Sequence, residues 1–329
     1  ARQLLQALVR RVDKPSKKSH RADRVEKEKS KSPLEAFNLH RLSQSQRARI
    51  LGMLLIPVNA DHTVSLRRAP DVAQACLEAY GNQTEPYVIS LRELLGVISA
   101  HEWRKKGVQV LTRDDEEIRI HPHYGVFSPV RGEYIELVLK TPLPAAIQKD
   151  SIAFDIGVGT GVLSVVLAMR GVQKILATDQ SERALACALE NITDLGLEDV
   201  VDVLNADLFP QSQAALIVCN PPWVPARPSS PIEHAVYDEG SRMLRGFLSG
   251  LRAHLTPNGE GWLILSDLAE HLGLRTREEL LCWMSEAGLQ LLGRHDIKPR
   301  HGKSADDTDP LHAARAKELT SLWRLGSAA

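Results

Sequence analysis

Apolar and polar residues follow a strand-then-helix rhythm through the second half of the chain. Short apolar runs bounded by turn residues predict strands, and longer runs with apolar residues three and four positions apart predict helices. The predicted strands cover residues 151–156, 174–178, 200–205, 214–219, 260–266, 289–297 and 318–326. The predicted helices cover residues 161–170, 181–193, 240–255 and 275–287. This alternation predicts an α/β fold, a seven-stranded, doubly wound and mainly parallel sheet with helices on both faces.

The pattern changes in the first half of the chain. Residues 1–33 are predicted to form a basic leader, flexible over 12–33, because this Lys/Ser-rich stretch buries too little apolar surface to offset the entropy of ordering. From Leu34 apolar residues return at helical spacing, and a small, mainly helical domain is predicted over 34–106.

Residues 107–140 are predicted to link the two domains through a β-hairpin with strands at 108–111 and 118–120. A second hairpin-like segment is predicted at 124–132, followed by a helix that begins near Glu133. The remainder, 141–329, is predicted to be the catalytic domain.

Composition and charge restrict the class of protein. Hydrophobic residues make up 43% and charged residues 25% of the 329 positions, as in ordinary globular proteins. No apolar run is long enough to cross a bilayer and no signal peptide is visible, so we expect a cytoplasmic protein without a membrane partner. Residues 1–33 hold eleven Lys/Arg against four Asp/Glu, and the rest hold 30 against 37. A basic arm suits RNA phosphates, but a solvated leader is the favoured interpretation.

Neither a metal site nor a disulfide framework is predicted. The four cysteines are scattered and form no C-x-x-C pair. His121 and His123 alternate along the chain and therefore share a face, but the sequence offers them no third ligand.

Three glycines follow the first strand of the predicted sheet. The segment Asp155-Ile-Gly-Val-Gly-Thr-Gly161 places them at 157, 159 and 161, with Thr160 before the last. Glycines let the backbone turn tightly and approach a ligand closely. The dinucleotide fingerprint G-x-G-x-x-G is not matched, because Val162 stands where its third glycine belongs. Asp155 would also repel a pyrophosphate, whereas it suits an amine-bearing ligand.

The next strand ends at Asp179, whose carboxylate can accept hydrogen bonds from both hydroxyls of a ribose. The D-x-G-x-G-x-G order resembles the first motif of class I methyltransferases, which implies S-adenosylmethionine as the cofactor. By this resemblance the cofactor-binding residues are those of the glycine turn together with Asp179, Gln180, Asp207, Leu208 and Asn220. Asp207 and Leu208 lie in Asn205-Ala-Asp-Leu-Phe209, which is similar to the adenine-contacting segment of that class.

The fourth strand of the predicted sheet is followed by Asn220-Pro221-Pro222-Trp223. This NPPW motif resembles the N-P-P-[YFW] signature of enzymes that methylate amino groups on planar systems, so these four residues are the predicted catalytic ones. The side-chain oxygen of Asn220 and the carbonyl of Pro221 can each accept one N–H of the acceptor, which orients its nitrogen. The prolines stiffen the loop, and Trp223 offers a flat face to a planar group.

Two families resemble the chain. Release-factor glutamine methyltransferases share the helical N-terminal domain, the hairpin linker and an N-P-P-Y-[VI] loop over residues 34–300, which implies a macromolecular partner such as a translation factor. Their P-R-P-[ED]-T-E linker is Ser128-Pro-Val-Arg-Gly-Glu133 here. The rRNA guanine-N2 methyltransferases share Gly125-Val-Phe-Ser128 and the block from Asp155 to Ser164. A protein glutamine amide is the favoured acceptor and an rRNA base the alternative. A non-catalytic S-adenosylmethionine-binding protein and a small-metabolite acceptor stay open.

Overall fold

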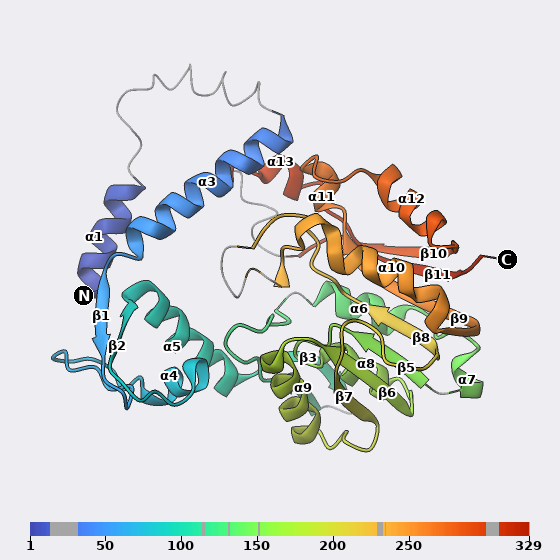
Figure 1. Cartoon of the computed structure of the whole chain (residues 1–329), viewed down its shortest axis with the longest axis horizontal. Helices are drawn as coiled ribbons and strands as arrows, with labels where there is room; N and C mark the ends of the chain where they lie inside the picture. Colours follow the sequence, from blue (N-terminus) through green and yellow to red (C-terminus); the bar gives the residue numbers. More distant parts are fainter. Residues whose placement is uncertain are drawn as a thin grey trace. The chain divides into compact units, whose positions relative to one another are not determined.

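The computed structural model describes residues 1–13, 32–113, 116–130, 132–150, 152–228, 233, 235–300 and 309–328. The chain divides into two compact units, residues 1–106 and 107–329 (Figure 1). Most of the expected flexible stretch, from 14 to 31, lies outside the described residues.

The N-terminal unit is mainly helical, as the sequence predicts. Its elements are α1 (Arg2–Val12), α3 (Pro33–Leu51), β1 (Leu55–Val58), α4 (Ala73–Tyr80), β2 (Tyr87–Ser90) and α5 (Leu91–Lys106). Helix α1 lies within the range of the predicted leader, and Asp13 at its end pairs with Arg47 of α3 at 2.8 Å. Helix α3 begins with a capping box between Ser32 and Glu35, which satisfies backbone N–H groups of its first turn.

Strands β1 and β2 pair antiparallel, with Ile56 opposite Ile89. This small sheet was not predicted, because the sequence pattern over 34–106 indicates only helices. Each strand has only four residues. Both strands adjoin a helix, and an apolar run this short fits the two-residue period of a strand as well as the 3.6-residue period of a helix.

The C-terminal unit begins with the β-hairpin linker, β3 (Val108–Arg113) and β4 (Glu116–Ile120), which pair antiparallel as predicted. The prediction of a second hairpin-like segment was wrong: the described residues from 124 to 130 form a turn and irregular backbone without a strand. Pro129 lacks an N–H for a ladder. The carbonyl of Tyr124 accepts a hydrogen bond from the Arg183 side chain instead of from a partner strand. Helix α6 (Glu133–Lys140) begins where the sequence predicts it.

The remainder of the unit alternates strands and helices. In chain order its elements are α7 (Ile147–Asp150), β5 (Ile152–Ile156), α8 (Val162–Met169), β6 (Lys174–Asp179), α9 (Glu182–Asp194), β7 (Val201–Asn205), β8 (Ala214–Cys219), the 3-10 turn η2 (Glu239–Ser241), α10 (Arg242–His254), β9 (Leu255–Ser266), α11 (Leu268–His271), α12 (Arg277–Glu286), β10 (Leu289–Ile297), α13 (His312–Arg315) and β11 (Thr320–Ser327).

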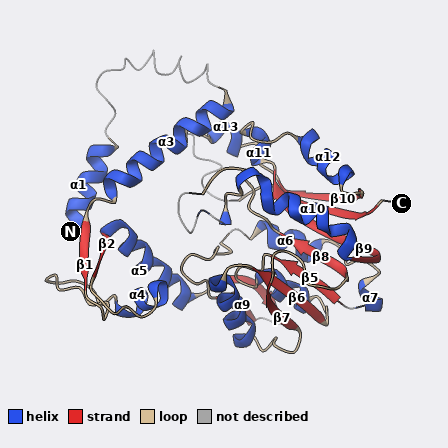
Figure 2. Ribbon diagram, in the orientation of Figure 1, coloured by secondary structure: helices blue, strands red, loops and turns tan. Residues whose placement is uncertain are grey.

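Seven strands form one mixed sheet in the order β10-β11-β9-β8-β5-β6-β7. Strand β11 is antiparallel to both of its neighbours, and the pairs among β7, β6, β5, β8 and β9 are parallel. This order and the helical N-terminal unit confirm the predicted α/β, Rossmann-like fold. Strand order reverses at β5, where the chain continues on one side to β6 and returns on the other side as β8 (Figure 2).

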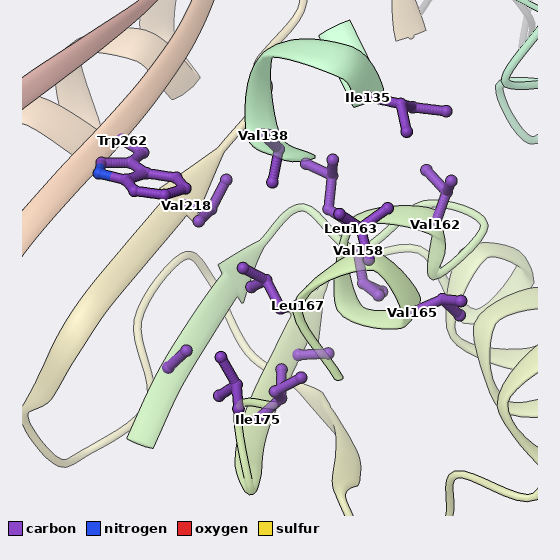
Figure 3. Packing of buried hydrophobic residues seen from close by; sticks show 14 of the residues in the cluster. Ile135, Val138, Val158, Val162, Leu163, Val165, Leu167, Ile175, Val218 and Trp262 are labelled. Atoms are coloured by element: carbon purple, nitrogen blue, oxygen red, sulfur yellow. The ribbon is translucent and has the colours of Figure 1, made fainter. Parts of the chain in front are cut away.

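Helices cover both faces of the sheet because its central strands are apolar on both sides. On one face, Ala153 and Val218 pack with α6, α8 and α9, and the indole of Trp262 lies beside Val218 (Figure 3). On the other face, Phe154 and Ile217 pack with α10 and α12. Adjacent residues of β5 and β8 thus serve opposite faces, as the two-residue period of a strand requires.

Candidate active site

The predicted site residues meet along one edge of the sheet. Strands β5, β6, β7 and β8 are parallel, and their last residues are in register: Ile156 lies opposite Thr178 and Cys219, and Asp179 lies opposite Asn205. The glycine turn and the NPPW motif directly follow β5 and β8, Asp179 is the last residue of β6, and Asp207 lies shortly after β7. In open α/β sheets, ligands bind at this carboxyl edge, next to the point where strand order reverses.

The glycine turn is held against β6 by its backbone. The N–H groups of Gly157 and Val158 both donate to the carbonyl of Thr178 at 2.8 Å. Gly157 has φ +78, and a Cβ there would lie 2.5 Å from the Met243 methyl carbon. Glycine at 157 is therefore favoured by the backbone conformation, and any larger residue would also displace the end of the flexible Met243 side chain. The carbonyl of the buried Thr160 accepts a hydrogen bond from Asn191 at 3.1 Å.

Asp179 is fixed by two backbone donors. Its Oδ2 accepts from the N–H of Gly159 at 3.2 Å, and its Oδ1 accepts from the N–H of Ser181 at 2.9 Å. Each carboxylate oxygen can accept a further hydrogen bond. The carboxylate therefore combines a fixed position next to the glycine turn with free acceptor capacity for a pair of hydroxyl groups.

Asp155 is a buried carboxyl with one oxygen that lacks a partner. It is 1% exposed, its Oδ2 accepts from Ser164 Oγ at 2.7 Å, and its Oδ1 has no hydrogen bond. Burial raises the pKa of Asp155 from 3.8 to about 7; the hydrogen bonds of Ser164 oppose this rise and the charge of Asp179 adds to it. The site therefore favours a cationic group or an N–H donor beside Oδ1.

Asp207 lies after β7 and is paired within the chain. Its Oδ1 accepts from the Gln180 side chain, and its Oδ2 accepts from Arg242 Nη2 at 3.0 Å. Leu208 has φ +68, and its carbonyl accepts from the Thr178 hydroxyl. Gln180 and Asp207 are both exposed, so the Asp207 carboxylate is in contact with solvent at the border of the site.

The NPPW loop is attached to the start of α10. Val224 pairs with Tyr237 in a parallel bridge, and the N–H of Asp238 donates to the carbonyl of Val224 at 2.9 Å. The Asp238 carboxylate in turn accepts from the N–H groups of Met243 and of the following residue. Burial raises the pKa of Asp238, and these backbone donors oppose that rise. Within the loop, Trp223 Nε1 donates to Asn220 Oδ1 at 2.9 Å.

Several residues that shape this edge were missed from sequence. Asn191 of α9 is 1% exposed, its Oδ1 accepts from the N–H of His121 at 2.7 Å, and its Nδ2 reaches the glycine turn. Its place on the buried stripe with Cys187 and Ala188 was the only available signal. Ser164 ends the block shared with the rRNA methyltransferases, but its contact with Asp155 was not predicted, and Arg242 carries no signal of its own because a polar residue in a helix usually faces solvent.

The structure gives the two candidate histidines other contacts. His123 Nε2 lies 2.8 Å from the carboxylate of Glu190, and the N–H of His121 bonds Asn191. Across the described ranges, His, Cys, Asp and Glu side chains nowhere gather in a set of three or more that could hold a metal ion.

The donor set fits S-adenosylmethionine. Its ammonium and sulfonium groups suit the partnerless oxygen of Asp155, and its ribose hydroxyls suit Asp179. The glycine turn leaves no Cβ between the backbone and a ligand at this edge. A pyrophosphate at the glycine turn would place negative charge near Asp155, so a dinucleotide fits this edge poorly.

Comparison with known proteins agrees with this chemistry. Residues 117–275 match the methyltransferase small domain. The release factor glutamine methyltransferase of Shewanella oneidensis is 31% identical over 140 residues, which cover 38% of this chain and 48% of that protein. The ribosomal RNA large subunit methyltransferase G of Vibrio cholerae is 44% identical over 73 residues, 21% of this chain and 19% of that protein.

The chain thus spans about half or less of the length of these curated relatives. Among solved structures, the ribosomal protein L11 methylase of Lactobacillus delbrueckii aligns with a TM-score of 0.44 at 18% identity, over 69% of this chain and 93% of that one.

Fold and sheet-edge chemistry together define the class of this unit: an α/β domain whose candidate ligand site lies beyond strands β5 and β6. The chain carries a methyltransferase small domain of the class I, S-adenosylmethionine-dependent type. The predicted class and cofactor are thereby confirmed for this domain. None of the helices in the described part of the chain combines the length and apolar composition that crossing a bilayer requires.

Proposed function

We propose that this protein transfers a methyl group from S-adenosylmethionine to the NH₂ nitrogen of a planar group, and that its acceptor is the side-chain amide of a protein glutamine. The single observation that carries the proposal is the NPPW loop at the carboxyl end of β8, the strand next to β5 and its glycine turn. When bound, S-adenosylmethionine supplies an electrophilic methyl group on its sulfonium.

Two carboxylates are proposed to hold the donor. Asp179 binds the ribose hydroxyls, since backbone N–H groups fix its position beside the turn. Asp155 faces a positive group with the oxygen that has no partner in the chain. The exposed pair Gln180 and Asp207, together with Leu208, borders the adenine.

Asn220 and Pro221 are proposed to orient the acceptor. An amide nitrogen is a poor nucleophile, because its lone pair is delocalised into the carbonyl. Two carbonyl oxygens that each accept one N–H would aim the nitrogen's face at the methyl group and stabilise the positive charge that grows on it. The proton leaves after transfer, so the proposal needs no strong base. Residues 34–106 of the N-terminal unit are proposed to recognise the acceptor macromolecule.

The resemblance to the release factor glutamine methyltransferase favours a protein acceptor, because it covers 140 residues. The match to the rRNA methyltransferase is shorter but reaches 44% identity, which makes a base amino group the second candidate. Both acceptors present an NH₂ on a planar system, so the roles of Asn220 and Pro221 are the same for either.

The test uses extract from a strain that lacks the gene, incubated with the purified protein and methyl-labelled S-adenosylmethionine. Label that protease removes and nuclease spares supports the glutamine acceptor, and the reverse result selects RNA. The Asn220→Ala variant is expected to bind the donor normally and transfer label at least tenfold more slowly, about the loss of one oriented transition-state contact. Gln211→Ala removes an exposed amide after β7 and serves as the control. An Asn220→Ala variant as fast as the control would refute the proposed role.

A further inference from the structure

The hydrogen bond inside the NPPW loop fixes which atom of Asn220 faces which way. Trp223 Nε1 lies 2.9 Å from Asn220 Oδ1. An indole N–H can only donate, so its partner must be the carbonyl oxygen and not the NH₂ of the amide. The amide of Asn220 therefore has a single orientation as long as the indole stays in place.

The indole is held by its surroundings on both sides. Trp223 is partly buried and packs against the hydrophobic clusters of both sheet faces. Val224, the next residue, is 4% exposed, and its N–H donates to the carbonyl of Val236 at 3.2 Å. Two prolines with fixed φ precede the tryptophan. Rotating the ring away from Asn220 would therefore lose its packing against both clusters, and moving the loop backbone instead would break the hydrogen bond of Val224.

An amide oxygen accepts two hydrogen bonds. One position is taken by the indole, so Asn220 Oδ1 can accept one further hydrogen bond. A flipped amide would instead turn its NH₂ toward the NH₂ of the methyl-accepting group, and two donors cannot pair. We propose that Trp223 is a positioning residue, which sets the amide of Asn220 so that its oxygen meets the NH₂ of the methyl acceptor. This inference rests on the proposed function of the same loop.

A phenylalanine at 223 keeps a flat aromatic ring for stacking but removes the N–H donor together with the second ring of the indole. The control must therefore reproduce this loss of packing volume at another partly buried tryptophan. For Trp223→Phe we expect the wild-type affinity for S-adenosylmethionine in calorimetry. We also expect that the concentration of deletion-strain extract that gives half of the maximal rate is unchanged. The maximal rate of labelled methyl transfer should fall about five- to tenfold, the worth of one hydrogen bond. Trp283→Phe on α12 is the matched control, which alters a partly buried tryptophan outside the loop.

The double variant decides how Trp223 acts. If it works through Asn220, then Asn220→Ala/Trp223→Phe is no slower than Asn220→Ala alone, because the second change removes nothing further. Losses that multiply would overturn the inference. So would a Trp223→Phe variant whose main defect is a raised half-saturating concentration, which is the signature of lost stacking on the acceptor.

A spectroscopic test needs no acceptor. The chain has five tryptophans, so ¹⁵N labelling gives five indole cross-peaks, and the Trp223 peak is the one absent in Trp223→Phe. In Asn220→Ala this peak should shift upfield and exchange faster with solvent, while the other four stay in place. An unmoved peak overturns the inference even in an active enzyme. The Trp223 peak could instead shift while the wild-type protein transfers no label to any component of the extract. That result would confirm the hydrogen bond but overturn the proposed function, and the positioning role with it.

Discussion

Replacing Asp155 with asparagine tests the electrostatics at the centre of the site. The carboxyl is 1% exposed, and burial raises its pKa from 3.8 to about 7, with the charge of Asp179 adding to the effect. The folded protein therefore still holds a proton on Asp155 at pH values where the unfolded chain has already lost it. Asparagine preserves the shape and can still accept the hydrogen bond from Ser164.

The sign follows from the raised pKa. Stability contributed by this group is fully present below its unfolded pKa and is lost as pH rises through the folded value. From about pH 5 up to the folded pKa of about 7, the folded state holds one proton more on Asp155 than the unfolded chain does. This span is roughly two pH units, and each unit corresponds to about 1.4 kcal/mol of unfolding free energy. Asp155 alone should therefore lower the free energy of unfolding by roughly 3 kcal/mol across this range.

Urea-induced unfolding at several pH values measures this slope through tryptophan fluorescence. The Asp155→Asn variant should lose the decline of roughly 3 kcal/mol that Asp155 adds to the wild-type curve. Asp202→Asn removes a carboxylate on β7 that pairs with Lys174 at the surface, and we expect it to keep the wild-type slope. Parallel curves for the wild type and Asp155→Asn would refute the reasoning.

The same group links donor binding to protons. A positive group beside Asp155 favours its ionised form, so binding of S-adenosylmethionine near neutral pH should release a proton. Calorimetry in two buffers with different ionisation enthalpies should detect the release in the wild type, and the affinity should rise with pH through about 7. In Asp155→Asn both effects should vanish; equal proton release in both proteins would contradict the assignment.

Two further changes test the cofactor edge and the packing behind it. Asp179→Ala should weaken S-adenosylmethionine binding about tenfold or more, since it removes charge-assisted hydrogen bonds to the ligand; calorimetry measures this, and unchanged affinity would count against a ribose-binding role. Gly261→Ala would place a Cβ 2.3 Å from Leu251, so unfolding should become about 1–3 kcal/mol easier. Gly293→Ala, with its nearest neighbour at 3.9 Å, should be near neutral in the same denaturation assay.

The parts of the fold that could be predicted are those in which neighbouring residues decide the structure. The strand ending at Ile156, its glycines and the following helix follow from a short apolar run, from positive φ at Gly157 and from helical spacing. The seven strands were likewise found within a few residues, except that β9 starts at Leu255 rather than at 260. This extension pairs with β8 through a register shift, which no local pattern indicates.

The errors arise where a distant partner decides the conformation. Strand β2 exists because β1 lies beside it, although Val88 also fits the helical pattern that follows. The segment after His123 alternates like a hairpin, yet Pro129 and the contact of Tyr124 with α9 hold it as a loop. A sequence pattern indicates the local spacing of apolar residues, but it does not show which distant segment will pack or pair with them.

Asn191 shows how the predicted and unpredicted parts of the site are joined. Its side chain accepts from the backbone of His121 in the linker and donates to the carbonyl of Thr160 in the glycine turn. A buried amide with all of these bonds made favours one arrangement, because breaking any of them leaves an unpaired polar group in the core. The glycine turn therefore depends on the segment around His121, far from it in sequence, and Asn191 should be sensitive to substitution although it is not among the proposed ligand-binding residues.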